Sequence, residues 1–146
     1  MEPVPRTVLA FDFGARRIGV AVGNTLTATA EPLTTLPAGA AGPDWDALGR
    51  CFASWRPAVA VVGIPYNMDG TRGRLAAAAE AFAVELGARF GCEVALVDEQ
   101  LSSREAEAAL RGRRRSGALG RRVRREDVDS EAARVLLRQW LGGTVR

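Results

Sequence analysis

Three acidic residues stand at the ends of segments that the sequence predicts to be regular structure. Asp12 and Glu99 each end an apolar strand, and Asp129 lies near the start of the last helix. An unpartnered buried carboxylate costs several kcal/mol, so Asp12 needs an arginine, hydrogen bonds or a metal ion. Each acid alone also fits an ordinary turn, strand end or helix start. Together they form the kind of set that binds two divalent ions, which activate water and stabilise the leaving oxygen of a phosphodiester.

The sequence contains no histidine. A histidine general base is therefore excluded, and Ser-His-Asp and zinc hydrolases are disfavoured. A metal bound by carboxylates alone would be a hard one, and we expect Mg²⁺ or Mn²⁺, in two copies. Asp98 precedes Glu99 in the same strand and should point to the opposite side, so it is only a reserve ligand.

All 20 basic residues are arginine, and nine of them lie between Arg104 and Arg125, although the net charge is only +3. A guanidinium can bind a phosphate through two hydrogen bonds, so this density predicts a nucleic-acid partner. The stretch 111–126 lacks apolar periodicity and is predicted to be mobile and to order on substrate; the alternative is a solvated charged loop. The arginines expected to bind substrate are Arg104, Arg113, Arg114 and Arg115.

Two glycine-containing loops lie near the predicted site. Gly14 and Gly19 are expected to let the hairpin after Asp12 turn tightly beside a phosphate. The loop 63–73 follows a buried strand and leads into a helix, whose first backbone N–H groups suit a phosphate; the alternative is a simple turn. The sequence has neither the Gly-Lys-Ser/Thr of a P-loop nor a GxGxxG motif.

The pattern of apolar residues predicts one α/β domain over residues 1–146. Three antiparallel strands precede two parallel ones, which gives a mixed sheet flanked by helices, with the site at the carboxyl ends of the parallel strands. No apolar run is long enough to span a membrane, and Cys51 and Cys92 form no disulfide framework, so we expect a cytoplasmic protein. The expected strands are 7–12, 17–23, 25–36, 58–64 and 93–97, and the expected helices are 44–55, 74–90, 103–110 and 128–141.

Four ordered motifs resemble those of the YqgF/RuvX family. They are Asp-Phe-Gly-Ala-Arg-Arg-Ile-Gly from Asp12, Val-Gly-Ile-Pro-Tyr-Asn-Met-Asp-Gly from Val62, Val-Asp-Glu-Gln-Leu-Ser-Ser from Val97, and Asp-Ser-Glu-Ala-Ala from Asp129. The resemblance covers residues 7–141. It implies an RNase-H-like fold, and such proteins are described as pre-16S rRNA nucleases and as Holliday junction resolvase homologues.

The resemblance also implies roles for individual residues. Asp12, Glu99 and Asp129 would be the metal-binding catalytic acids of a phosphodiesterase. Arg17 and the loop with Asn67 and Asp69 would lie at the substrate face. Gln100 departs from the family, which usually has arginine after Asp-Glu, so one phosphate contact or carboxylate-orienting pair is in question.

The leading functional hypothesis is a metal-dependent nuclease that matures the 5′ end of pre-16S rRNA, with ribosomal precursor particles as partners. Cleavage of four-way DNA junctions is the alternative within that class, since arginines read phosphate and not the sugar. A non-catalytic nucleic-acid-binding module is the alternative of another class. Actin-like ATPases also use Asp-x-Gly on a first strand, but they need two such domains. Pairing into a homodimer stays open.

Overall fold

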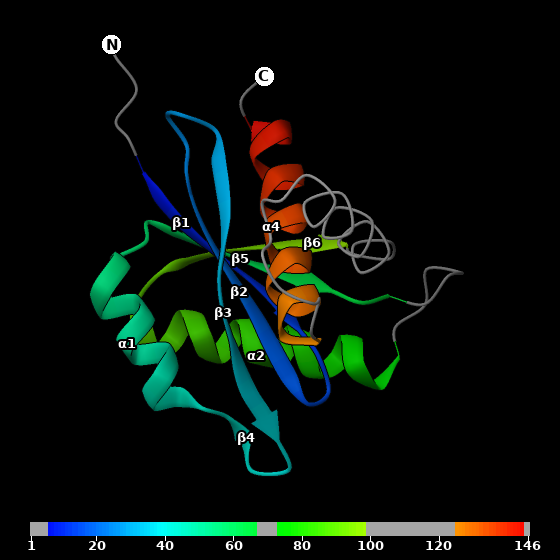
Figure 1. The fold of residues 1–146 in the computed structure, drawn as a ribbon. Helices are drawn as coiled ribbons and strands as arrows, with labels where there is room; N and C mark the ends of the chain where they lie inside the picture. The colour runs from blue at the N-terminus through cyan, green and yellow to red at the C-terminus, as the bar shows by residue number, and fades with distance from the viewer. Residues whose placement is uncertain (1–5, 67–72, 99–124, 145–146) are drawn as a thin grey trace.

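A mixed β-sheet with helices on both faces forms the middle layer of the protein (Figure 1). The computed structural model describes residues 6–66, 73–98 and 125–144. Strand order in the sheet is β4-β3-β2-β1-β5-β6. Neighbouring strands from β4 to β1 pair in antiparallel fashion, whereas β1, β5 and β6 run parallel to one another. The elements are β1 Thr7–Phe13, β2 Arg17–Asn24, β3 Thr29–Gly39, β4 Gly42–Pro43, α1 Trp45–Trp55, β5 Val59–Ile64, α2 Arg74–Phe90, β6 Glu93–Asp98 and α4 Arg125–Thr144.

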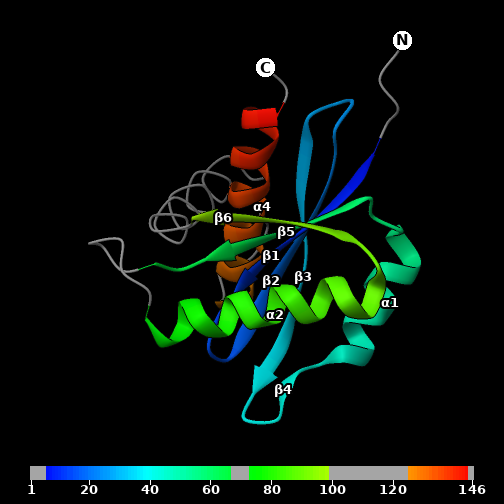
Figure 2. The same cartoon turned by 180° about the vertical axis from the view of Figure 1, so that it is seen from behind.

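The central strands β1 and β5 are apolar on both faces because helices cover both sides of the sheet. One face packs against α1 and α2, and the other against α4 (Figures 1 and 2). Side chains alternate along a strand, so Leu9 and Phe11 enter the first core and Val8 and Ala10 the second. This alternation also determines which face each residue at the strand ends occupies.

Aromatic rings fill the core on the α1 and α2 side. Phe11 stacks on Phe52 with the ring centroids 5.9 Å apart, and Phe52 stacks on Phe90 at 4.1 Å. Trp45 packs against this core, while Trp55 at the end of α1 is 41% exposed. On the other face, α4 contributes leucines and alanines at helical spacing, and Trp140 packs beside them.

The predicted α/β class, the mixed sheet and its strand directions are confirmed. The third strand differs from its prediction of 25–36, since β3 begins at Thr29 and continues to Gly39 before a short hairpin into β4. The prolines and glycines of residues 36–43 are typical of a loop. Strand structure persists there since Ala38 donates its N–H to the carbonyl of Arg16 at 2.9 Å, and Pro37 lies at the sheet edge, where its missing N–H costs little.

The last helix begins earlier than the predicted 128, at Arg125, so the end of the stretch 111–126 is helical. The remainder of that stretch, and the predicted helix 103–110, lie outside the described residues. In the part of the chain that the structure describes, no helix is long and apolar enough to cross a membrane.

Candidate active site

Asp12 lies near the end of β1 with a glycine beside it on each neighbouring strand. It pairs with Gly19 of β2 and with Gly63 of β5, and the same row continues to Thr35 of β3 and Val97 of β6. Val8 and Ala10 contact α4, so alternation places Asp12 on the α4 face. Its partners in the row are glycines, and it lies at the carboxyl edge of the parallel strands, where α/β proteins place their sites.

Gly19 allows α4 to pack closely on this row of residues. A Cβ atom at Gly19 would lie 1.9 Å from the carbonyl oxygen of Asp129 and 2.3 Å from its carbonyl carbon. Only glycine permits so close an approach of helix backbone to a strand. Since Gly19 is the direct partner of Asp12, this contact places the backbone of Asp129 next to Asp12.

A second glycine fixes the course of the helix along β2. A Cβ at Gly23 would lie 2.8 Å from the Cδ2 atom of Leu137. The helix rises about 12 Å from Asp129 to Leu137, and the strand rises about 13 Å from Gly19 to Gly23. These lengths match, so α4 runs alongside β2 in the same direction, with its first turns at the Asp12 edge (Figure 1).

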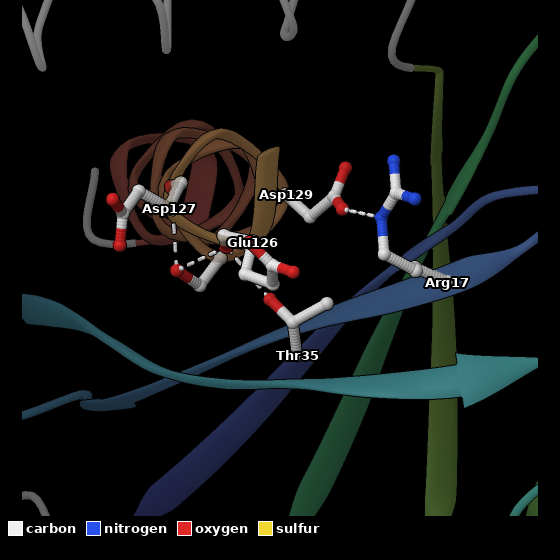
Figure 3. Close-up of polar contacts among 6 residues, drawn as sticks. Arg17, Thr35, Glu126, Asp127 and Asp129 are labelled. Carbon is white, nitrogen blue, oxygen red and sulfur yellow. Dashed lines mark hydrogen bonds and ion pairs between the residues drawn. The ribbon is translucent and has the colours of Figure 1, made fainter. Parts of the chain in front are cut away.

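Arg17 and Asp129 are joined across the site. The Nε–H of Arg17 donates to Oδ2 of Asp129 at 2.5 Å, and Figure 3 shows the guanidinium of β2 directed at the carboxylate of α4. This hydrogen bond, with the charge of Asp129, raises the pKa of Arg17 above its ordinary value; Glu126 adds a smaller contribution in the same direction. The two side chains are 31% and 26% exposed, so the pair remains open to a ligand.

The first turn of α4 is also tied to the sheet edge. Thr35, in the same row as Gly19, donates its hydroxyl to the carbonyl of Glu126 at 2.7 Å (Figure 3). Ser130 donates to the same carbonyl at 3.1 Å from within the helix. The start of the helix is thereby held at β3 by one hydrogen bond and at β2 by the Gly19 contact, which together set the height of Asp129 over the sheet.

The donor chemistry of this region suits a hard divalent ion. Asp12 and Asp129 supply carboxylate oxygens, and a chain without histidine offers no imidazole to favour a softer metal. Within residues 6–66, 73–98 and 125–144, no group of three or more His, Cys, Asp or Glu side chains forms a complete metal site. Glu99, the third predicted ligand, lies outside the described residues.

The structure places Asp98 on the other face of the sheet from Asp12. Ala95 and Val97 of β6 pack with the α4-side core, whereas Val94 packs with the opposite core. Asp98 shares the face of Val94 by alternation, at the end of β6. The reserve ligand therefore lies on the wrong side of the sheet.

Three of the predicted site residues come together, namely Asp12, Arg17 and Asp129. The other predicted positions lie outside the described residues, so the structure does not test them: Asn67, Asp69, Glu99, Arg104, Arg113, Arg114 and Arg115.

Sequence reasoning missed the roles of Gly19 and Thr35. Gly14 does belong to the hairpin turn, since its N–H donates to the carbonyl of Arg17 at 2.9 Å. Gly19 instead lies inside β2, under the helix. Two glycines four residues apart in an otherwise apolar strand are the signal that could have indicated a closely packed helix. No local pattern marked Thr35.

A mixed sheet of this order, with helices on both faces and carboxylates at its carboxyl edge, defines the RNase-H-like class of fold. Two solved structures of Thermus thermophilus RuvC share it. The one in complex with a Holliday junction substrate has a TM-score of 0.54 and 19% identity over 94% of both chains, and the other has 0.54 and 16% over 94% of this chain and 95% of that one.

The family follows from sequence. The profile of the RuvX family, described as Holliday junction resolvase, matches residues 6–143. A protein of Pectobacterium carotovorum (strain PC1) is 45% identical over 92% of this chain and 94% of its own, and one of Pasteurella multocida (strain Pm70) is 46% identical over 92% and 93%. Both carry the name "Putative pre-16S rRNA nuclease". The chain belongs to the RuvX family.

Proposed function

We propose that this protein is a metal-dependent nuclease that hydrolyses phosphodiester bonds in structured nucleic acid. The observation that carries the proposal is the placement of Asp12, Arg17 and Asp129 at the carboxyl edge of β1, where the backbone of α4 packs on Gly19. Two carboxylates and a partly exposed arginine match the charges of a phosphodiester and its metal ions.

Each residue has a distinct part in the proposal. Asp12 and Asp129 would hold Mg²⁺ or Mn²⁺, which when bound supplies an activated water and stabilises the leaving oxygen. Glu99, which follows β6 in the sequence, is proposed as the third metal ligand. Arg17 orients the Asp129 carboxylate and lies where it can also bind the phosphate. Gly19 lets the backbone of α4 approach β2 closely enough to hold Asp129 beside Asp12. The remaining predicted contacts, Asn67, Asp69, Arg104, Arg113, Arg114 and Arg115, extend the substrate face.

The substrate we favour is pre-16S rRNA, cleaved to mature its 5′ end, because relatives at 45% and 46% identity carry that activity in their names. Such a substrate would place the protein in the cytoplasm with ribosomal precursor particles. The second candidate is a four-way DNA junction, favoured by the description of the family and by the likeness of the fold to RuvC. A junction has two-fold symmetry and would call for a homodimer.

The acids are tested by substitution. Asp12→Asn and Asp129→Asn keep the size of the side chain and remove its charge, so both should lose cleavage by at least about 100-fold while still binding nucleic acid. The matched control is Asp46→Asn on α1, on the other face of the sheet, which should cleave at the normal rate. Normal cleavage by Asp12→Asn would mean that this acid is not catalytic, whereas binding without cleavage by the wild type would favour a binding module.

The choice of substrate is tested in parallel reactions. A fragment that spans the 5′ boundary of 16S rRNA and a four-way DNA junction are offered to the same preparation, each with Mg²⁺ and with Mn²⁺, and the mass of the complexes is measured. Preferential cleavage of the RNA supports maturation. Preferential cleavage of the junction by a dimer would replace it with the second candidate.

A further inference from the structure

A cavity of about 350 Å³ opens at the same edge of the sheet, but on the α2 side. Its walls come from three places: the end of β1 with the turn that follows, the β3–β4 hairpin, and the first turns of α2. Phe13, Pro43 and Leu75 give it apolar surface, and Arg74 stands among them. This volume is at the small end of the range for sites of small organic ligands.

The cavity adjoins the candidate active site along the chain. Phe13 directly follows Asp12 in β1, so the two side chains point to opposite faces of the sheet. Ala15, in the turn between β1 and β2, lines the cavity two residues before Arg17. A strand bound at Asp12 would have to pass the end of this hairpin to reach the cavity, which would then receive a nucleotide to one side of the cleavage position.

The charges at this corner suit an anionic chain. Among the described residues that line the cavity, Arg74 alone is charged. Arg16 is exposed at the adjoining turn, and its carbonyl accepts the N–H of Ala38 in the cavity wall at 2.9 Å. Arginine beside an apolar slot matches the two parts of a nucleotide, a phosphate and a flat base. An apolar side chain of a protein partner would leave that charge unused.

Contacts within the protein hold the walls of the cavity. The ring of Phe13 packs against Phe82 with the centroids 5.1 Å apart, and the hairpin turn is closed by the hydrogen bond from Gly14 to Arg17. A preformed slot loses less entropy on binding than one that must be assembled. Single-stranded nucleic acid is commonly bound by inserting unstacked bases against apolar and aromatic surfaces.

We propose that this cavity binds an unstacked nucleobase of the substrate strand, next to the nucleotide cleaved at Asp12, with Arg74 on the adjoining phosphate. The proposal rests on the proposed nuclease function, because the strand must pass Asp12. It adds a reason for the enzyme to act on unpaired or branched positions, since only there can a base leave its stack.

Base removal and cavity filling together test the proposal. Abasic sites are placed one at a time around the cleavage position in the pre-16S fragment and in the four-way junction, and affinity is measured in EDTA so that nothing is cut. The wild type should lose about tenfold in affinity at one position. Ala78→Leu narrows the cavity from α2, so it should bind the intact substrate about tenfold more weakly and show no further loss at that position.

The matched control is Ala77→Leu, an exposed neighbour on α2 outside the cavity lining, which should behave as wild type. Leucine favours helix at both positions, and thermal unfolding checks that both variants fold. Arg74→Gln should reduce the slope of log affinity against log salt by about 0.7, the contribution of one single-strand phosphate. Arg50→Gln on α1 should leave that slope unchanged.

Three results would overturn the proposal. No abasic site lowers the affinity of the wild type, an abasic site lowers the affinity of Ala78→Leu as much as that of the wild type, or neither nucleic acid binds. The parallel cleavage assay separates the two hypotheses. If the protein cleaves but no abasic site shows a loss of affinity that Ala78→Leu abolishes, the base site is wrong and the nuclease function stands. If one abasic site shows such a loss but nothing is cleaved, the base site stands and the nuclease function is wrong. Effects of Ala78→Leu that are independent of every base would also overturn the base site.

Discussion

Arg17 and Asp129 lie 112 residues apart in sequence and are joined by a 2.5 Å hydrogen bond from Nε to Oδ2. The bond links the second strand to the last helix over the row of residues that contains Asp12. A carboxylate expected to hold a metal ion is thus already held by an arginine. The arginine can orient this carboxylate, and its charge also opposes the binding of a divalent cation nearby.

Arg17→Gln should separate these two effects. If its charge opposes the metal, the variant will bind Mn²⁺ more tightly than the wild type, and Arg17→Lys, which keeps the charge, will not. Both variants should cleave at least about tenfold more slowly, because neither glutamine nor lysine has the planar guanidinium that can donate two parallel hydrogen bonds. Mn²⁺ affinity is measured by calorimetry without nucleic acid, with Arg16→Gln as the neighbouring control. Weaker Mn²⁺ binding by Arg17→Gln would mean that orientation outweighs charge.

The same pair should contribute little to stability. Both side chains are about a quarter to a third exposed, and such ion pairs contribute less than about 1 kcal/mol. The bond to Asp129 raises the pKa of Arg17, so the stabilisation from this arginine is present at neutral pH, and loss of the arginine's proton removes it only as the pH rises through the raised folded value. Deprotonation of Arg17 should therefore cause no decline in the cleavage rate between neutral pH and pH 10.

Gly19→Ala should be among the most damaging small substitutions in the chain. Its Cβ would overlap the carbonyl group of Asp129, and backbone cannot move aside as a side chain can. We expect a loss of about 3 kcal/mol in the free energy of unfolding, measured with urea, and loss of cleavage as α4 is displaced. Gly39→Ala, in β3 with nothing within 4 Å of its Cβ, should change stability by less than about 0.5 kcal/mol.

The comparison between Gly14 and Gly19 shows what the sequence could and could not predict. Gly14 serves a local turn, and a local pattern of strand, glycine and strand was enough to place it. Gly19 serves a contact with Asp129, and nothing near Gly19 in sequence specifies the helix that packs there. Arg17 and Asp129 were each predicted to lie at the site, but their direct hydrogen bond depends on the same long-range packing.

The strands show the same difference between what local sequence patterns predict and what depends on the rest of the sheet. Continuous apolar runs predicted β1 and β5 well, because strands buried on both faces need them. β3 was misplaced at both ends. Residues 25–28, whose threonines and alternating apolar residues predicted strand, form a turn in which Asn24 accepts the N–H of Leu26. At the other end prolines and glycines indicate a loop, yet an edge strand tolerates a residue without an N–H on its open side. Alternation also holds within β6, where Val97 packs on the α4 side and Asp98 lies on the opposite face. That rule needs only one strand and no tertiary contact.

The two cysteines should be slow to react. Burial raises the pKa of Cys51 and of Cys92 above their ordinary value of 9.0, so both thiols stay protonated in the folded protein. Unfolded chains lose these protons first as the pH rises past 9.0, and the free energy of unfolding should fall from that point upwards. Urea unfolding at several pH values tests this. The double variant Cys51→Ala, Cys92→Ala should show a smaller fall, and an equal fall would assign it to other groups.

Thr35→Val should loosen the start of α4 without opening a cavity. Valine has the shape of threonine but cannot donate to the carbonyl of Glu126, which Thr35 contacts at 2.7 Å. The free energy of unfolding should drop by about 1 kcal/mol, and amide exchange should accelerate in the first turns of α4 more than in β1. Because these turns carry Asp129, cleavage should fall more steeply on warming than in the wild type. Thr34→Val, the neighbour on the opposite face, is the control; if it speeds exchange in α4 equally, then the hydrogen bond of Thr35 is not what holds the helix.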